Sequence, residues 1–330
     1  MRIKFFTEGG KGIGFGHISR CLSLCQAFEE FSKECIFIVK GGEEVKEVIH
    51  VPLKLMDWVE NLNSFEKELE DAQIVIVDSY LAKQEHYQIA CAKAEKCLFV
   101  DDFNRLEYPC GYVLNGSVYA GELNYPIKNS VYYLLGTQYT PLRRAFWHVE
   151  KKDIGMQIER ILITFGGDDA QNMTFRVVKH LEDVFPHIDK LVVIGSGFKN
   201  RSQILSLKSN KVRIYQNLSE EDMKTLMVLC DMAVSAGGQT TYELARVGLP
   251  SVLVAVAQNQ LLNCLSWEKV GFALYAGWWE DGMLLDKIAK YIRSLEDANI
   301  RLKMSEVGRL LVDGQGARRV AYKMVNYPTL

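Results

Sequence analysis

A glycine-rich stretch near the start of the chain limits the possible folds more than any other feature. Residues 9–20 read GGKGIGFGHISR, with five glycines in eight positions. An apolar run precedes the stretch, and apolar residues at helical spacing follow it. This order of strand, glycine loop and helix is typical of α/β folds whose ligands contact the loop backbone. We therefore expect Gly14 and Gly16 to contact a ligand, with His17 at the helix entrance on the carboxyl edge of a sheet.

Two other interpretations of this loop need to be weighed. In the dinucleotide-binding pattern G-x-G-x-x-G, His17 takes the place of the third glycine. The second strand ends in Lys40-Gly41-Gly42, where a carboxylate for the ribose is expected. We therefore set nicotinamide dinucleotides aside. The simpler alternative is a glycine turn with a helix-capping histidine, because a glycine loop alone is a weak signal.

Length and composition indicate an ordinary two-domain enzyme. The 330 residues suffice for two separate cores, and 39 basic against 41 acidic residues give a net charge of −2, which favours neither nucleic acid nor an anionic membrane. We expect no signal peptide and no membrane insertion, because the chain lacks a basic and apolar leader and any run of membrane-spanning length. The eight cysteines form no Cys-x-x-Cys pair. We expect them to be reduced and mostly buried in a cytoplasmic protein without a zinc site.

Short β-rich runs alternate with amphipathic segments along the chain, which predicts mostly parallel sheets covered by helices. The alternation breaks between residues 136 and 155, so we expect two Rossmann-like domains, 1–154 and 155–330. Spacing alone leaves open whether the last helix, about 316–325, returns to the first domain. The predicted strands are 3–6, 35–39, 74–77, 97–100 and 112–114 in the first half, and 160–165, 192–194, 212–215 and 251–254 in the second.

Polar side chains follow two neighbouring strands of the first domain. Tyr80 comes directly after the run 74–77 and its Asp78-Ser79 pair, so it should share the carboxyl edge with His17 and could hydrogen-bond a ligand. An ordinary half-buried aromatic is an equally good interpretation. Asp101-Asp102 follow the next strand and suggest a metal-bound nucleotide, but no further ligand at suitable spacing supports this. A turn or cap is the favoured role, and we expect no metal.

The second half contains a candidate phosphate site. Residues 235–240, SAGGQT, lead from a buried strand to the start of a helix. Free N–H groups, hydroxyls and the helix dipole there favour an anion such as a diphosphate. Glu243, one turn into the helix, could accept hydrogen bonds from a ribose diol. The alternative is a simple helix cap, with Glu243 as a surface charge.

Three consecutive amides, Gln258-Asn259-Gln260, follow the strand 251–254. Amides donate and accept hydrogen bonds, which suits sugar hydroxyls and N-acetyl groups. A capping asparagine at a helix start is the alternative.

The motifs resemble one family in order along essentially the whole chain. Residues 14–24, GFGHISRCLSL, resemble the G-x-G-H-x-x-R-x-L-x-L signature of the UDP-2,4-diacetamido-2,4,6-trideoxy-β-L-altropyranose hydrolases of pseudaminic acid biosynthesis. Residues 143–146, RRAF, depart from the pattern by lacking the acidic residue often found before this phenylalanine. Further matching segments are VDSY at 77–80, DD at 101–102, LN at 114–115, YTPLR at 139–143, FGGDDAQN at 165–172 and DGQGA at 313–317.

The resemblance implies a GT-B-like fold, similar to MurG-type glycosyltransferases, with two Rossmann-like domains facing each other across a cleft. It implies His17, Tyr80 and Asn259 as catalytic residues of a cytoplasmic enzyme that cleaves the glycosyl C–O bond of a UDP-sugar with water. Neither cofactor nor metal is implied, and the pathway is linked to flagellin glycosylation. The expected UDP contacts are Gly14, Gly16, Gly167, Ser235, Gly237, Gly238, Gln239, Thr240 and Glu243, and the expected sugar contacts are Gln258 and Gln260.

In such a reaction UDP leaves without a general acid if helix-end N–H groups meet its charge. His17 would take the proton of the water, with a pKa near the ordinary value of about 6.5. A GT-B glycosyltransferase is the alternative, although no basic or apolar patch typical of membrane-acting transferases stands out in the first domain. A nucleotide-sugar-binding module without catalysis is a third possibility, and it would not need His17. The sugar's stereochemistry and the oligomeric state are left open.

Overall fold

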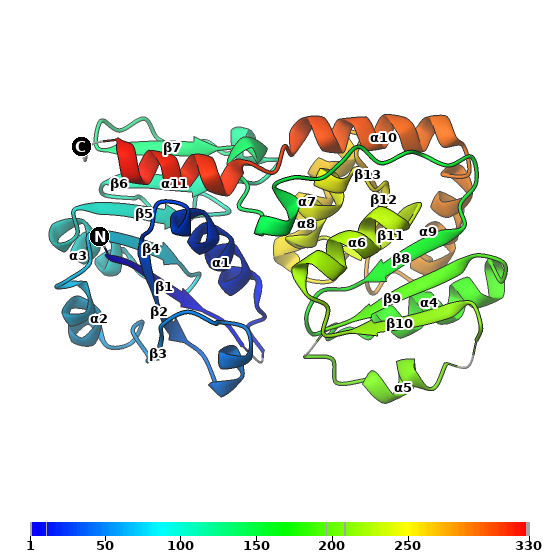
Figure 1. Ribbon diagram of the computed structural model, residues 1–330, viewed down its shortest axis with the longest axis horizontal. Coiled ribbons are helices and arrows are strands. Elements are labelled where there is room, and N and C mark those ends of the chain that lie inside the picture. Colours follow the sequence, from blue (N-terminus) through cyan, green and yellow to red (C-terminus); the bar gives the residue numbers. More distant parts are fainter. Residues whose placement is uncertain (1, 11, 196, 208, 328–330) are drawn as a thin grey trace. The chain divides into compact units, whose positions relative to one another are not determined.

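The computed structural model describes residues 2–10, 12–195, 197–207 and 209–327. Lys11 and Ser196, which belong to two of the predicted loops, lie outside this range. The chain divides into two compact units. Unit 1 comprises Met1–Arg144 and Gly314–Leu330, and unit 2 comprises Ala145–Asp313 (Figure 1).

Unit 1 is built on a parallel sheet of seven strands in the order β3-β2-β1-β4-β5-β6-β7. The strand order reverses between β1 and β4, so the carboxyl ends of these two strands flank the topological switch point, where open α/β sheets bind ligands. The strands are β1 Arg2–Glu8, β2 Glu34–Lys40, β3 Leu53–Leu55, β4 Ile74–Asp78, β5 Lys96–Val100, β6 Gly111–Asn115 and β7 Val131–Leu135. The helices are α1 Gly16–Glu29, α2 Leu62–Leu69, α3 Gln84–Lys93 and α11 Gly316–Asn326, with short 3-10 helices at Glu43–Glu47, Ala120–Glu122 and Thr137–Tyr139.

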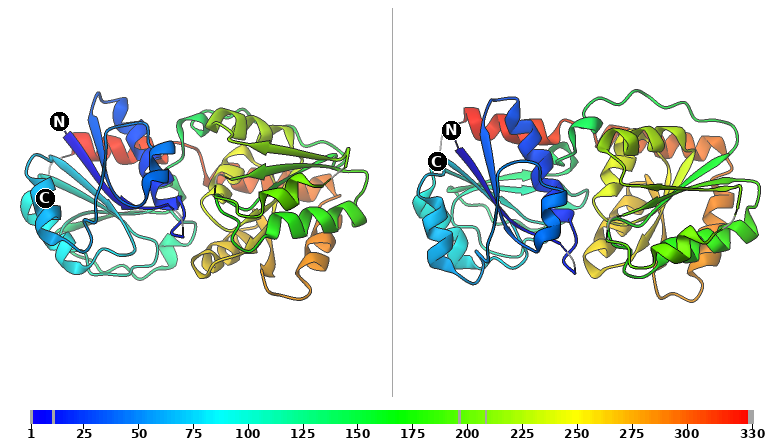
Figure 2. Two further views of the ribbon diagram at one scale, coloured as in Figure 1. Left: turned by 90° about the horizontal axis from the view of Figure 1, so that it is seen from below. Right: turned by 60° about the horizontal axis from the view of Figure 1, so that its bottom comes forward.

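The central strand β1 is buried on both faces. Phe5 stacks on Phe37 of β2 and meets Phe28 of α1 edge-on. The next residue, Phe6, points to the opposite face, where it packs against Phe65 of α2. Because successive side chains of a strand alternate between faces, a continuous apolar run such as this one requires helices on both sides. Figure 2 shows the sheet between its helical layers.

The last helix, α11, packs against α1 within unit 1 (Figure 1). Gly316, at its first turn, lies directly against the main chain of Thr140, where a side chain would have no room. At the other end, Lys96 donates a hydrogen bond of 2.9 Å to the main-chain carbonyl of Met324. Residues 314–327 therefore complete the first unit, a point that spacing alone had left open.

The chain enters unit 2 after Arg144, earlier than the expected boundary at 154/155. The charged, turn-rich segment that follows resembles a linker in sequence, but arginines of unit 2 bind its main chain. Arg246, Arg309 and Arg301 donate hydrogen bonds to the carbonyls of Phe146 (3.0 Å), Val149 (3.2 Å) and Gly155 (2.8 Å) respectively.

Unit 2 is built on a parallel sheet of six strands in the order β10-β9-β8-β11-β12-β13, which reverses between β8 and β11. The two switch points therefore occupy equivalent positions in the two sheets. The strands are β8 Arg160–Thr164, β9 Asp189–Ile194, β10 Val212–Gln216, β11 Met232–Ala236, β12 Ser251–Ala255 and β13 Ala273–Trp278. The helices are α4 Met173–Val184, α5 Arg201–Leu205, α6 Glu220–Leu229, α7 Thr240–Val247, α8 Gln258–Lys269, α9 Leu284–Ser294 and α10 Ala298–Leu311, and a 3-10 turn spans Arg144–Phe146.

The core of unit 2 follows the same rule as that of unit 1. Ile161 and Ile163 of β8 are fully buried and pack with Val177 of α4 and Ile288 of α9. On α10, Gly308 lies against the ring of Phe272 and the main chain of α7, so the helices approach closely at this position. The predicted fold class, two Rossmann-like units with parallel sheets, is confirmed.

The cysteines differ from the expectation at one pair. Cys91 of α3 and Cys110, just before β6, form a disulfide with their Cα atoms 6.1 Å apart. The prediction that all eight cysteines are reduced is therefore wrong for these two, because the fold brings together residues that sequence spacing does not pair. The other six are free and buried, as expected.

Candidate functional site

The glycine loop after β1 is closed by its own main chain. Gly10 and Gly14 exchange hydrogen bonds of 3.0 and 2.8 Å, and α1 begins two residues later at Gly16. Gly14 has a φ of +88°, which glycine adopts without strain, and a side chain there would meet open space. The loop thus exposes its backbone beside His17, the second residue of the helix, which is itself only 9% exposed.

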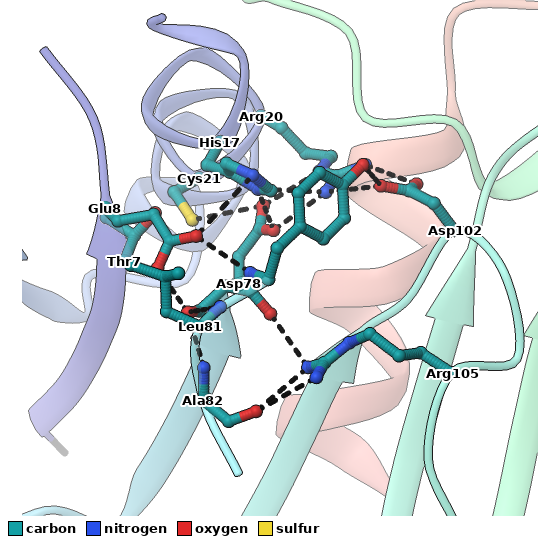
Figure 3. Close-up of polar contacts among 12 residues, drawn as sticks. Thr7, Glu8, His17, Arg20, Cys21, Asp78, Leu81, Ala82, Asp102 and Arg105 are labelled. Atoms are coloured by element: carbon teal, nitrogen blue, oxygen red, sulfur yellow. Dashed lines mark hydrogen bonds and ion pairs between the residues drawn. The ribbon is translucent and has the colours of Figure 1, made fainter. Parts of the chain in front are cut away.

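His17 is paired with the carboxylate of Asp78, the last residue of β4 (Figure 3). Nδ1 of His17 and Oδ1 of Asp78 are 2.6 Å apart. Burial opposes ionisation of Asp78, but the charges of Arg20 and His17 outweigh it and hold the pKa of this carboxyl well below its usual range. An ionised carboxylate can only accept, so Nδ1 carries the hydrogen and donates it. In the neutral ring, Nε2 is then the proton acceptor.

The pKa of His17 is raised above the ordinary histidine value. Burial lowers this pKa, but the charge and hydrogen bond of Asp78 raise it by more. The expectation of an unperturbed pKa near 6.5 is therefore wrong, because the sequence did not indicate that the carboxylate of Asp78 would hydrogen-bond the His17 ring.

Arg20, one turn further along α1, links two carboxylates. Its guanidinium donates to Asp78 at 2.7 and 2.8 Å and to Asp102, after β5, at 2.7 Å. Asp102 also accepts a hydrogen bond of 2.5 Å from the hydroxyl of Tyr80. The Tyr80 ring meets the His17 ring edge-on, with the centroids 4.5 Å apart. Burial and the nearby Asp102 raise the pKa of Tyr80, so its hydroxyl stays protonated.

The two residues of the Asp101-Asp102 pair have different roles. Asp101 accepts hydrogen bonds from the main-chain N–H of Asn104 (2.7 Å) and the hydroxyl of Tyr125 (2.5 Å), which is the turn role favoured from the sequence. Asp102 instead joins the network around His17 and Tyr80. The loop that carries Tyr80 is fixed in addition by Arg105, which donates to the carbonyls of Ser79 and Ala82, both at 3.1 Å.

Glu8, at the end of β1, is a further charged residue beside His17 that the sequence reasoning missed. Its carboxylate is 2% exposed, and its Oε1 lies 4.0 Å from Nε2 of His17. The available signal was its position as the last residue of a buried strand, directly before the glycine loop.

In unit 2, the predicted phosphate loop follows β11 at the switch point. The N–H of Gly237 donates to the carbonyl of Val254 at 3.0 Å, and its Cα lies against the sulfur of Cys264, so a side chain would clash there. Ser235 is buried in the strand, while Gly238, Gln239 and Thr240 are half-buried where α7 begins.

Glu243 lies in the first turn of α7 and is 6% exposed, so it is not the surface charge that a simple cap would give. Beneath the loop, Asn263 donates to the carbonyl of Gly237 at 2.9 Å. Trp267 donates to the hydroxyl of Thr241 at 3.0 Å. These contacts from α8 hold the start of α7 in place.

The three predicted amides form the first turn of α8. Gln258 and Asn259 are exposed there. Gln260 uses its oxygen within the fold, accepting from the N–H groups of Gly237 and Val256 at 3.2 Å each. Gly167, predicted to contact UDP, is exposed after β8 and accepts from the N–H of Gly197 at 2.9 Å. The predicted residues of unit 2 thus gather at the carboxyl ends of β8, β11 and β12.

Within the described residues, the side chains close enough to share a metal ion are Cys91, Cys97 and Cys110, and none of them is a predicted site residue. In the same part of the chain, no helix combines the length and apolar character needed to cross a membrane.

The two-unit architecture is GT-B-like, and solved structures share this fold. The structure of MurG from Acinetobacter baumannii superimposes on this chain with a TM-score of 0.68 at 13% identity. The superposition covers 98% of this chain and 99% of that one. The Staphylococcus aureus MnaA–UDP co-structure gives 0.69 over 99% of this chain and 96% of that one, at 14% identity. At these identities the likeness concerns the fold.

Named relatives agree with the resemblance seen in the motifs. The Helicobacter pylori pseudaminic acid cytidylyltransferase and UDP-2,4-diacetamido-2,4,6-trideoxy-beta-L-altropyranose hydrolase is 25% identical over 82% of this chain and 47% of its own length. The Bacillus subtilis spore coat polysaccharide biosynthesis protein SpsG is 23% identical over 97% of this chain and 96% of its own. The chain spans about half the length of the Helicobacter relative and of a Methanocaldococcus jannaschii relative, of which it covers 56%. No family model matches.

Proposed function

We propose that the protein hydrolyses the glycosyl C–O bond of a UDP-linked diacetamido-trideoxy sugar, releasing UDP and the free sugar. The observation that carries this proposal is the His17–Asp78 pair at 2.6 Å, which leaves Nε2 as a proton acceptor at the switch point of unit 1. Water becomes a nucleophile when a base removes its proton, and Nε2 of His17, at the start of α1, would be that base. A pure binding module would not need it.

The comparisons support this substrate class. Relatives in Helicobacter pylori and Campylobacter jejuni carry the name of the altropyranose hydrolase, and the similar MnaA structure contains UDP. The free sugar would enter nonulosonic (pseudaminic) acid biosynthesis in the cytoplasm and serve flagellin glycosylation. The Bacillus relative points instead to a spore coat polysaccharide as the destination.

Unit 2 would hold the nucleotide. The diphosphate would lie at residues 237–240, where the N–H groups at the start of α7 and the helix dipole favour negative charge. Glu243, buried in the first turn, would accept hydrogen bonds from the ribose hydroxyls. Gly14, Gly16 and Gly167 would contribute backbone contacts, and Gln258 and Gln260 would face the sugar.

The reaction would proceed by direct attack of water. Nε2 of His17 takes the proton, and Asp78 stabilises the resulting imidazolium through the Nδ1–H hydrogen bond. Tyr80, held by Asp102, and Asn259 orient the sugar. Departure of UDP needs no general acid because the helix N-terminus meets the developing phosphate charge. No step uses a cofactor or a metal ion.

A GT-B glycosyltransferase that uses a UDP-sugar donor is the second candidate. The observation that favours it is the fold, because similar structures include MurG and the calicheamicin glycosyltransferase CalG4. The two candidates differ in the nucleophile, which is water in one and an acceptor hydroxyl in the other.

The test is to incubate the protein with UDP-linked diacetamido-trideoxy sugars and follow the products by NMR. Hydrolysis predicts equal amounts of UDP and free sugar without any added acceptor. UDP release only after addition of an acceptor, with a new glycoside, would support the transferase instead.

A further inference from the structure

Glu8 is fixed at the switch point of unit 1 by the loop that follows β4. Its Oε1 accepts a hydrogen bond of 2.8 Å from the main-chain N–H of Tyr80, and its Oε2 accepts one from the hydroxyl of Ser79. With 2% of its surface exposed, the side chain has little freedom to move. A buried carboxylate is therefore held in a defined position next to the proposed base.

The distance from Glu8 to His17 suits a bridging water. Oε1 lies 4.0 Å from Nε2, which is too long for a direct hydrogen bond. An oxygen atom about 2.8 Å from each of the two atoms fits this separation. Such a water would donate one O–H to Nε2 and the other to the carboxylate, and its lone pairs would remain available for attack. Figure 3 shows Glu8 and Asp78 around the same imidazole.

The loop uses both oxygens of Glu8 as acceptors. The hydroxyl of Ser79 already accepts from the N–H groups of Leu81 and Ala82, both at 3.0 Å, so it donates its own hydrogen to Glu8, and an amide nitrogen in that place could not accept it. A carboxylate beside Nε2 adds what an amide lacks, an acceptor for a water proton and a negative charge for the imidazolium.

We propose that Glu8 and His17 together hold the water that attacks the sugar, which makes Glu8 a second catalytic residue. This proposal rests on the proposed hydrolase function. The water oxygen bonds to the anomeric carbon while the C–O bond to UDP breaks, and UDP leaves with the electron pair. The water proton passes to Nε2 and then to solvent, so UDP-sugar and water give UDP, free sugar and one proton. Glu8 takes no proton and stabilises the positive charge that develops on the ring and on the sugar.

The effect on pH dependence follows from the charges around the imidazole. Loss of the Glu8 charge destabilises the imidazolium, so the acid limb of the rate profile should move to lower pH. Loss of the water contact should lower kcat without changing the binding of the nucleotide. The titratable and charged groups that face His17 or its partners are Glu8 from β1, Arg20 and Cys21 from α1, Asp78 and Tyr80 at the end of β4, and Asp102 after β5.

The test compares the wild type with Glu8→Gln. For the variant we expect kcat to fall by about 10 to 100-fold with KM and UDP affinity within about threefold, and the acid limb to move to lower pH. Asp101→Asn is the matched control. This variant neutralises another buried carboxylate. Asp101 follows the neighbouring strand, is 4% exposed, and accepts hydrogen bonds from Asn104 and Tyr125 rather than contacting His17. Its kcat and acid limb should match the wild type.

A second variant covers the case in which Glu8→Gln does not fold. Glu8→Asp keeps the charge but withdraws the oxygen by one methylene, so kcat should fall while the acid limb stays near its wild-type position. If either Glu8 variant keeps the wild-type kcat, Glu8 does not hold the water. The same conclusion follows if Asp101→Asn lowers kcat as much as Glu8→Gln does. Hydrolysis by the wild type with an unchanged Glu8→Gln rejects the Glu8 proposal alone. No free sugar from the wild type rejects it together with the proposed function.

Discussion

The imidazole of His17 has a different carboxylate beside each of its nitrogens. Asp78 contacts Nδ1 at 2.6 Å, whereas Glu8 lies 4.0 Å from Nε2. The short contact fixes the tautomer, and the longer one leaves room for a ligand atom. This asymmetry gives the ring an orientation and a free lone pair before any substrate binds, which is the preorganisation that a general base needs.

Replacement of His17 tests the base directly. His17→Asn keeps some size and hydrogen bonding but cannot take the proton, so we expect turnover to fall by about 10²–10⁴-fold. UDP affinity should stay near the wild-type value, because the proposed nucleotide site lies in unit 2. Steady-state kinetics and calorimetry measure the two quantities. Near-normal turnover, or a loss of UDP binding in parallel with activity, would remove the catalytic role.

The pKa of His17 predicts the pH profile of the wild type and of an Asp78 variant. Asp78 raises this pKa. As the pH is lowered, the base should therefore become protonated, and the rate should begin to decline, at a pH above about 6.5, the ordinary histidine value. Asp78→Asn removes the charge that stabilises the imidazolium, so the acid limb should move to lower pH and the maximal rate should drop. Profiles of kcat/KM against pH check this. An identical limb in both proteins would contradict the assignment of the limb to His17.

Glu243 should contribute to UDP affinity. Its side chain is buried in the first turn of α7, and Glu243→Ala removes a carboxylate acceptor for the ribose. We expect weaker UDP binding by about 1.5–3 kcal/mol, the range for hydrogen bonds to charged groups. Calorimetric titration provides the value, and Glu296→Ala, which removes an exposed carboxylate of the same unit, serves as the control. Equal affinity in all three proteins would disprove the ribose contact.

The sequence indicated the site residues that follow a recognisable strand. It did not indicate contacts between residues that only the fold brings together. His17 and Tyr80 follow recognisable strands, so their common sheet edge could be predicted. Arg20 and Asp102 meet across 82 positions of sequence, and neither has a local pattern that names its partner. The same limit applies to Cys91 and Cys110, whose pairing depends on how α3 and β6 dock.

The contact between α7 and α10 depends on the absence of a side chain at Gly308. Alanine stabilises a helix interior by about 1 kcal/mol relative to glycine. Here a Cβ would lie 2.6 Å from the ring of Phe272 and 2.9 Å from the carbonyl of Ala245, so overpacking should outweigh that gain. We expect Gly308→Ala to lower the thermal midpoint of unfolding, as followed by circular dichroism. Gly121→Ala, where a Cβ meets nothing within 4 Å, is the control. An unchanged or higher midpoint in Gly308→Ala would contradict this account.

Buried strands were predictable from sequence, but three of the four edge strands were not. The apolar runs of β1, β4 and β12 are buried along their length and were located within two residues at each end. The strands without a prediction, β3, β7 and β13, all lie at a sheet edge. An edge strand has fewer neighbours, so exposed residues such as Tyr132 interrupt its pattern.

At the scale of the whole molecule, the proposed chemistry predicts independence from metal ions. The diphosphate site consists of main-chain N–H groups and a helix N-terminus, which bind anions without a bridging cation. Hydrolysis should therefore continue at the same rate in EDTA, measured as UDP release. Loss of activity in EDTA and its return with magnesium would contradict this and bring Asp101 and Asp102 back as ligands.

The return of α11 to unit 1 sets an order for synthesis on the ribosome. Unit 2 is one uninterrupted segment, Ala145–Asp313, so all of it has been translated before the first residue of α11. Unit 1 has its seven strands much earlier, but α1 stays without its packing partner until residues 316–326 emerge. The nascent chain therefore carries an incomplete first unit until these last residues emerge. The part that is made first, and that contains His17, is the last to be finished.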